Sequence, residues 1–208
     1  MIPIAREGWV FISVPLILAA ILWAVGWQVG AVASLVLAVA VSVFFRDPPR
    51  RVPRGEGLIL APADGTVVQV ARYPGDELDG AANQLSIFLS VLDVHVNRAP
   101  FATVVESVHY RPGTFRLAWK HEASAANEQN LIVLKAPQGR LLVKQIAGFL
   151  ARRIVCRIVP GQTLEAGERI GMIRFGSRVD LIVPENVKLS VKPGDRVKGG
   201  VSVVGTLR

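Results

Sequence analysis

The sequence is poor in cysteine and histidine. Cys156 is the single cysteine among 208 residues, so the chain cannot form an internal disulfide bond. The three histidines, His95, His109 and His121, lack the spacing of metal ligands, and one cysteine does not make a structural zinc site. We therefore expect no metal centre, and we expect Cys156 to be a core residue of a strand.

Acidic residues are scarce relative to basic ones. The chain has 24 lysines and arginines against 16 aspartates and glutamates, which gives a formal charge of +8. No nucleic-acid-binding motif accompanies this excess, so we expect no nucleic-acid partner. Four arginines instead follow directly after the longest apolar segment: Arg46, Arg50, Arg51 and Arg54. Such a cluster favours anionic lipid headgroups on the cytoplasmic side of a membrane.

Residues 9–45 contain no charged side chain. A helix rises about 1.5 Å per residue and crosses a bilayer core with roughly 20 residues, so this run is too long for one span. Gly26-Trp27-Gln28-Val29-Gly30 predicts a turn, and we expect a transmembrane helical hairpin, roughly 9–25 and 30–45, as an anchor over 1–45. An anchor is favoured over a signal peptide or buried core helices, since no small-residue cleavage site follows. The hairpin would leave the bulk domain on the cytoplasmic side of the cell membrane.

The rest of the chain is mainly β, which makes the whole an α+β protein. Residues 46–56 are rich in Pro and Arg and predict a linker, so 57–208 forms one domain. Five segments rich in β-branched and apolar residues predict strands: Gly65–Arg72, Leu85–Val91, Val104–Tyr110, Asn130–Ala136 and Arg140–Ala147. The last two flank Pro137-Gln138-Gly139, a hairpin signal. Residues 118–129 and 148–153 predict loops or short helices.

A weak repeat lies near the C-terminus. Val159–Gly167 and Lys192–Gly200 both place a Pro-Gly turn before a short strand and a second Gly turn. This pattern is typical of a flattened β-barrel or sandwich of the biotinyl or lipoyl type. Gly176-Ser177 lies between the copies with apolar residues on both sides, so we expect the pair on or between core strands.

Gly176-Ser177 could carry chemistry, although most Gly-Ser pairs are turns. Glycine permits strained backbone conformations, and the Ser177 hydroxyl could attack the uncrowded Gly176 carbonyl if a base takes its proton. His95 is the best candidate base, since it follows an apolar strand, on the same face as Asp93. Asp64 lies in a Pro-Ala-Asp-Gly turn. Taken singly, the structural interpretation is favoured for each: Asp64 would be a turn-forming residue and His95 a hydrogen-bonded core group.

Several motifs together resemble, in their order, the phosphatidylserine decarboxylase proenzymes. They are Phe44-Phe45-Arg46-Asp47-Pro48, Pro62-Ala63-Asp64-Gly65, Asp93-Val94-His95-Val96-Asn97-Arg98, Arg111-Pro112-Gly113-Thr114-Phe115, Asn127-Glu128 and Gly176-Ser177. The resemblance runs from about residue 44 to the C-terminus and is strongest to the short, hairpin-anchored form of the family.

The resemblance implies that the chain cleaves itself between Gly176 and Ser177. Ser177 would attack the Gly176 carbonyl, the resulting ester would eliminate, and residue 177 would become a covalent pyruvoyl cofactor. Fragments 1–176 and 177–208 would stay together as a heterodimer. Asp64 and His95 would assist Ser177 as orienting and proton-transfer groups.

The resemblance also implies a lyase that converts phosphatidylserine to phosphatidylethanolamine in phospholipid biosynthesis. The pyruvoyl carbonyl would take up the substrate amine and accept the electrons left when CO2 departs. His95 is the candidate acid, and Arg98 or Arg178 would hold the phosphodiester. Longer bacterial members carry Leu-Gly-Ser-Thr in place of Phe175-Gly176-Ser177-Arg178, and a second histidine where this chain has Arg98. Which group takes that histidine's role is left open.

Two other functions stay open. A non-enzymatic, membrane-anchored β-barrel adaptor or carrier module fits the repeat, but a carrier needs a lysine at a hairpin tip, where this chain has Gly176-Ser177. Decarboxylation of a related serine ether lipid would use the same headgroup chemistry. The oligomeric state, including a homo-oligomer, is also left open.

Overall fold

The computed structural model divides the chain into two compact units, Met1–Pro49 and Arg50–Arg208. The residues that the structure describes are 3–78, 80–114, 127–136, 139–148, 153–174 and 177–207.

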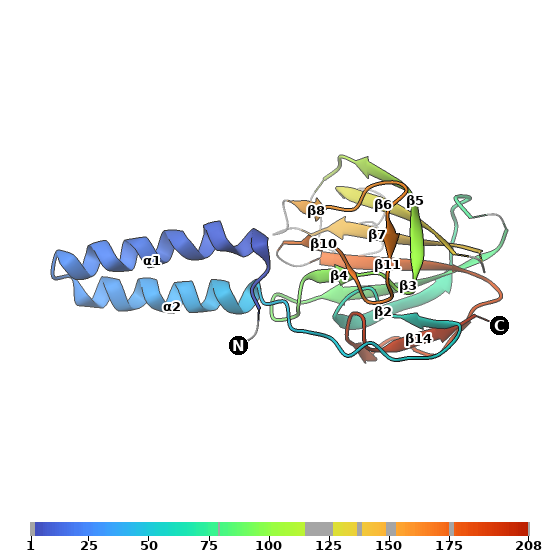
Figure 1. Ribbon diagram of the computed structural model, residues 1–208, viewed down its shortest axis with the longest axis horizontal. Coiled ribbons are helices and arrows are strands. Elements are labelled where there is room, and N and C mark those ends of the chain that lie inside the picture. Colours follow the sequence, from blue (N-terminus) through green and yellow to red (C-terminus); the bar gives the residue numbers. More distant parts are fainter. Residues whose placement is uncertain are drawn as a thin grey trace. The chain divides into compact units, whose positions relative to one another are not determined.

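The N-terminal unit is a pair of helices joined by a tight turn (Figure 1). A short 3-10 helix (Arg6–Gly8) leads into α1 (Trp9–Ala24), and α2 (Gln28–Phe44) returns antiparallel to it. The turn needs Gly26, whose φ of +83° lies in the left-handed region that favours glycine. Most of the buried side chains in the helices are small, among them Ala19, Ala31 and Ala38, although Ile12 is buried too. The Ser34 hydroxyl donates to the carbonyl of Pro15 at 2.8 Å. The two predicted helices are therefore confirmed.

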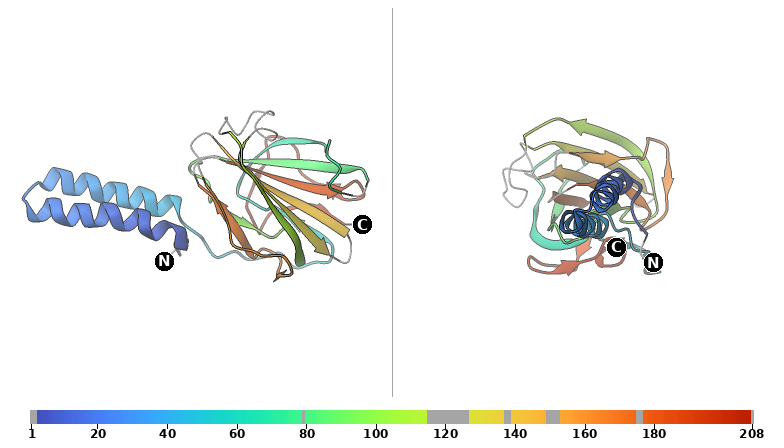
Figure 2. Two further views of the ribbon diagram at one scale, coloured as in Figure 1. Left: turned by 90° about the horizontal axis from the view of Figure 1, so that it is seen from above. Right: turned by 90° about the vertical axis from the view of Figure 1, so that its left-hand side faces the viewer.

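The second unit is built almost entirely of strands. They are β1 (Leu58–Leu60), β2 (Gly65–Arg72), β3 (Ala82–Leu89), β4 (Val96–Arg98), β5 (Thr103–Arg111), β6 (Gln129–Ala136), β7 (Gly139–Ala147), β8 (Ile154–Cys156), β9 (Thr163–Leu164), β10 (Arg169–Ile173), β11 (Ser177–Pro184), β12 (Lys188–Leu189), β13 (Arg196–Val197) and β14 (Val203–Thr206). The largest sheet runs β13-β2-β3-β11-β7-β6-β5-β9, and two smaller sheets run β1-β14-β12 and β4-β10-β8. The large sheet is strongly curled (Figure 2). The prediction of a mainly β chain is confirmed.

Strand β11 lies in the middle of the large sheet, antiparallel to β3 on one side and β7 on the other. Alternate side chains of β11 point to opposite faces of the sheet. Val179, Leu181 and Val183 enter the main hydrophobic core, together with Ser177 at the start of the strand. Arg178 and the other even-numbered residues of β11 therefore face the other side.

The two copies of the Pro-Gly repeat make equivalent hydrogen bonds. Gly194 N donates to Val67 O, and Gly161 N donates to Val105 O, each at 2.8 Å. Val67 lies at a register shift in the pairing of β2, and Val105 lies at the corresponding shift in β5. The repeat seen in the sequence is thus a structural repeat, in which each copy joins its own strand in the same way.

The two copies also touch each other. Gly167 and Gly200 both have positive φ, +76° and +71°, and a β-carbon on Gly200 would come within 3.3 Å of the Gly167 Cα. These glycines follow β9 and β13, which form the two edges of the large sheet. Only glycine permits both this backbone conformation and this approach. The contact brings the opposite edges of the curled sheet together.

One predicted strand is displaced. Leu85–Val91 was expected to be extended, but β3 covers Ala82–Leu89 and a turn follows. The Asp93 carboxylate causes this turn, because it accepts hydrogen bonds from the backbone N and the hydroxyl of Ser90 at 2.8 and 2.7 Å. The predicted loops 118–129 and 148–153 lie mostly outside the described residues, as do Pro137 and Gln138 of the hairpin turn, but β6 and β7 pair as expected.

Candidate active site

Ser177 begins strand β11 and is completely buried. Leu89 of β3 and Ala147 of β7 pair with it on either side. Its hydroxyl oxygen has no hydrogen-bond partner among the described residues. A buried hydroxyl without a partner costs free energy, so the position calls for an explanation beyond packing. Gly176, the other half of the predicted cleavage site, lies outside the described residues.

His95 is held next to the strand that leads to Ser177. Its backbone carbonyl accepts a hydrogen bond from Ile173 N at 3.3 Å, at the end of β10. The ring is fully buried, with Nδ1 at 2.9 Å from the carbonyl oxygen of Asp93. A carbonyl only accepts, so Nδ1 is the donor and a neutral ring has its basic lone pair on Nε2. Asp93 itself lies in the turn, so the expectation that it shares a strand face with His95 is wrong.

Asp64 is fixed by a cation and by a backbone amide. Both of its carboxylate oxygens lie 2.9 Å from Nη2 of Arg50, and Oδ1 also accepts from Gly199 N at 2.8 Å. The two side chains are only 10% and 13% exposed, so solvent screens this ion pair weakly. Sequence reasoning missed Arg50, because it stands in the Pro- and Arg-rich stretch that predicted a linker. Nothing local distinguishes it from the arginines around it.

The turn that carries Asp64 is joined to strand β4. Arg98 N donates to the carbonyl of Pro62 at 2.8 Å. Gly65 continues the turn with a φ of +152°, and a β-carbon there would overlap the backbone carbonyl of Phe88. Gly65 therefore allows β2 to approach β3 directly beside Asp64.

Asp64, His95 and Ser177 lie at the same end of the large sheet. Thr66, Phe88 and Arg178 form one row across β2, β3 and β11. Two strand spacings, about 10 Å in all, separate the backbones of β2 and β11. Asp64 comes two residues before Thr66 of β2, and Ser177 comes one residue before Arg178 of β11. His95 directly precedes β4. The structure thus brings the three predicted catalytic residues into one region.

Arg98 is half-buried beside the repeat glycines. Its Nη1 donates to the carbonyl of Gly167 at 3.0 Å, and its Cδ packs against Gly200. Because Arg98 is joined to the turn that holds Asp64, it occupies the same end of the sheet as the predicted catalytic residues.

Arg178 points away from the side chain of Ser177. Its Nε donates to Asp180 Oδ1 at 2.6 Å and its Nη2 donates to Ser86 Oγ at 2.7 Å. Gln84 donates to the other oxygen of Asp180 at 2.9 Å. Arg178 is 2% exposed and Asp180 is fully buried. The pair is a buried network on the opposite face of β11 from Ser177.

Burial shifts the pKa of two side chains around the sheet. Desolvation lowers the pKa of Lys144, against the opposing effect of the nearby Asp180 charge. Desolvation also raises the pKa of the Cys156 thiol in β8, which packs at the edge of the hydrophobic core. A protonated thiol is a poor nucleophile. Cys156 is only half-buried, so it packs against the core rather than within it as predicted.

A chain of buried amides lies on the face of the sheet that Ser177 shares. Gln145 Nε2 donates to Asn97 Oδ1 at 2.8 Å, and Asn130 Nδ2 donates to Gln145 Oε1 at 3.1 Å. Asn97 and Gln145 are fully buried. Asn97 Nδ2 has no partner among the described residues. Asn97 was part of the motif around His95, but sequence reasoning gave it no role.

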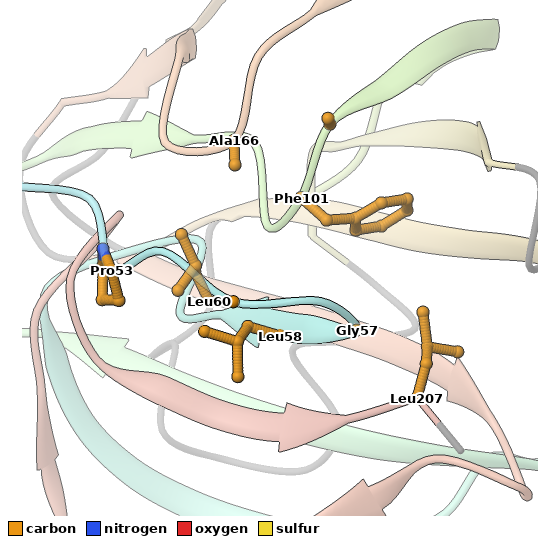
Figure 3. A pocket seen from close by; sticks show the side chains of 9 residues that line it. Pro53, Gly57, Leu58, Leu60, Phe101, Ala166 and Leu207 are labelled. Carbon is orange, nitrogen blue, oxygen red and sulfur yellow. The ribbon is translucent and has the colours of Figure 1, made fainter.

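An apolar cavity of about 190 Å³ lies elsewhere in the unit (Figure 3). Leu58, Leu60, Phe101 and Leu207 are among its lining residues, and the lining does not include Asp64 or Ser177. Ligand sites usually enclose about 300–1,000 Å³, so this cavity is small for a substrate. The region around Ser177 is the stronger candidate site.

Comparison with known proteins matches residues 37–205 to the family model described as phosphatidylserine decarboxylase. Three curated relatives carry the name phosphatidylserine decarboxylase proenzyme. The protein from Symbiobacterium thermophilum is 45% identical over 98% of this chain and 95% of its own length. Those from Geotalea daltonii and Wolbachia sp. subsp. Brugia malayi are 42% and 41% identical, each over 98% of this chain, and over 96% and 91% of their own lengths.

Proposed function

The chain belongs to the phosphatidylserine decarboxylase family and is a carbon–carbon lyase, and we propose that it cleaves itself between Gly176 and Ser177 to form a pyruvoyl group at residue 177. The observation that carries this proposal is the Ser177 hydroxyl, which is fully buried at the start of a central strand without a hydrogen-bond partner among the described residues. A nucleophile that must attack the preceding carbonyl needs such freedom.

The surroundings of Ser177 fit a pyruvoyl group. The group is small, uncharged and without donors, so it suits a buried position between Leu89 and Ala147. Bound there, it would supply an electron sink for loss of CO2. The protein would supply exclusion of water and fixed proton donors.

His95 and Asp64 have the proposed proton-transfer and orienting roles. The Asp93 carbonyl accepts a hydrogen bond from Nδ1 of the His95 ring, so Nε2 is the basic nitrogen of the neutral ring. Asp64 is held by Arg50 and by the Gly199 amide, so it enters the site as a fixed charge. In the mature enzyme His95 would return a proton to the substrate carbon.

The fold supports a stable heterodimer of 1–176 and 177–208. After cleavage β11 would still pair with β3 over eight residues and with β7 over six. The small fragment also contributes β13 to the large sheet and β14 to a second sheet. The contact between Gly167 and Gly200 joins the two copies of the repeat across the cut, and it supports a barrel of the biotinyl or lipoyl type.

The phospholipid substrate needs a cation for its phosphodiester. Arg98 is the better placed of the two predicted arginines, because it lies half-buried at the end of the sheet where Asp64 is joined to β4. Arg178 would have to leave Asp180 and Ser86 before it could bind a phosphate. The chemistry does not distinguish ester from ether tails, so a serine ether lipid remains the second candidate substrate.

The helix pair is proposed as the membrane anchor. Arg6–Ala24 is long and apolar enough to cross a bilayer, and Gln28–Phe44 is slightly shorter. Most of the buried side chains in the two helices are small, as in membrane proteins, while many large apolar side chains face outward. The outward residues include Val10, Val14, Ile17, Ile21, Val29, Val36 and Val39. The arginines after α2 would hold the second unit on the cytoplasmic side.

A denaturing gel of the purified full chain tests the proposal. Wild type should give a small C-terminal fragment that starts at residue 177 with a blocked, hydrazine-reactive N-terminus. Ser177→Ala, with an unchanged circular dichroism spectrum, should stay intact. If the wild-type chain also stays intact, the self-cleavage proposal is wrong. Release of CO2 from phosphatidylserine and from its ether analogue then separates the two substrates.

A further inference from the structure

Two polar atoms that lack partners among the described residues are buried against the same face of the large sheet. They are the hydroxyl oxygen of Ser177 and the amide nitrogen of Asn97, and both residues are fully buried. A buried polar atom that is left unsatisfied costs free energy. What distinguishes Asn97 is its position, because a donor on the face that Ser177 shares can bind a group that forms next to Ser177.

The backbone pairing places Asn97 close to the start of β11. Gln145 is two residues from Ala147, which pairs with Ser177, so Gln145 and Ser177 are diagonal neighbours on one face. Diagonal neighbours lie about 7–8 Å apart. The side chain of Gln145 reaches Asn97 at 2.8 Å. Asn97 is therefore hydrogen-bonded to a side chain that is a diagonal neighbour of Ser177.

The amide chain fixes the orientation of Asn97. Asn130 donates to Gln145, and Gln145 donates to Asn97. The Asn97 oxygen is therefore already an acceptor, and its Nδ2 is the atom that can donate to another group. Asn97 pairs with Gly171 in β10, the strand that leads toward Ser177. The absence of a side chain at Gly171 leaves room for the Gln145 amide, which a β-carbon would approach to 3.0 Å.

We propose that the Asn97 side-chain amide is the oxyanion donor of self-cleavage, an inference that rests on the proposed reaction of Ser177. The Ser177 oxygen forms a bond to the preceding carbonyl carbon while its proton passes to a base. The carbonyl electron pair moves onto oxygen, and the Asn97 N–H stabilises this negative charge. The carbon–nitrogen bond then breaks, the nitrogen takes up a proton, and an ester remains.

Removal of a single oxyanion donor lowers a rate by about 100- to 1,000-fold. Asn97→Asp keeps the oxygen that accepts from Gln145 but removes the N–H, and Asn97→Ala removes both without adding charge. Gln129→Leu is the matched control. Gln129 is also a buried amide whose side-chain atoms lack partners in the described part of the chain. It precedes Asn130 on β6, so it faces the opposite side of the sheet.

The full chain is synthesised in a cell-free system with detergent micelles and a pulse of labelled methionine. Both methionines, Met1 and Met172, precede the cleavage point, so the label follows the large fragment. We expect both Asn97 variants to cleave at least about 100-fold more slowly than wild type, and Gln129→Leu to cleave within about threefold of it. Hydroxylamine, which cleaves esters, should not restore the fragments in the Asn97 variants, because the ester does not form.

Three results would overturn the proposal. The first is cleavage of either Asn97 variant within threefold of wild type. The second is release of fragments by hydroxylamine from a slow variant, which would place the defect after ester formation. The third is unfolding of both Asn97 variants in a Ser177→Ala background, which would make Asn97 a structural residue. An intact wild-type chain would instead refute self-cleavage itself, so the two failures are distinguishable.

Discussion

The buried pair of Arg178 and Asp180 should contribute strongly to the stability of the second unit. Arg178→Met leaves the carboxylate of Asp180 buried without the guanidinium but still bonded to Gln84, and Asp180→Leu leaves the guanidinium with Ser86. Both side chains are at most 2% exposed, so water cannot replace the lost partner. Removal of one member of such a pair costs about 3–5 kcal/mol, whereas replacement of both by apolar residues is close to neutral.

Thermal unfolding of the full chain in detergent measures this effect. The Ser177→Ala background keeps every variant in one uncut state. For a protein of about this size, 1 kcal/mol shifts the Tm by roughly 2–4 °C, so each single variant should lose roughly 6–20 °C. The double variant Arg178→Met with Asp180→Leu should unfold near the parent. A double variant that falls by the sum of the two losses would refute the coupling.

The same double variant, with Ser177 restored, tests whether Arg178 takes part in self-cleavage. Arg178 lies on the opposite face of β11 from Ser177, so a folded double variant should still cleave itself. Loss of cleavage in a folded double variant would mean that Arg178 acts on the site. Normal cleavage with a raised KM for phosphatidylserine would support the predicted role of Arg178 in substrate binding.

Two further changes test the position of Asp64. Arg50→Ala should slow self-cleavage by about tenfold, since the charge that holds Asp64 is lost, while the exposed Arg51→Ala should leave the rate unchanged; equal rates in a pulse-chase experiment would contradict the role of Arg50. Gly65→Ala should lower the Tm sharply, because the added β-carbon overlaps the carbonyl of Phe88. Gly139 also has a positive φ but open space around it, so Gly139→Ala should lower the Tm far less. Similar Tm losses in the two variants would show that backbone strain, and not the overlap, causes the loss at Gly65.

The sequence alone predicted those features that depend on neighbouring residues. The apolar run of 9–45 predicts two helices, and the β-branched segments predict strands, because both signals depend on the composition of neighbouring residues. The prediction that the third strand extends to Val91 was wrong, because a hydrogen bond to the Asp93 side chain overrides the strand propensity of these residues. The ordered motifs also indicated the family, and with it Ser177.

Tertiary structure decided which side chains meet and which face they share. Arg50 holds Asp64 across fourteen residues, and Gln145 reaches Asn97 across forty-eight, contacts that no local pattern predicts. A residue's face is also set by strand register, since a shift of one residue exchanges the two faces of a strand. Ser177 and Arg178 are adjacent in the chain, yet sheet pairing directs them to opposite sides. The sequence by itself determined the family, the two helices and most of the long strands, and the pairing of distant strands decided the groups that surround Ser177.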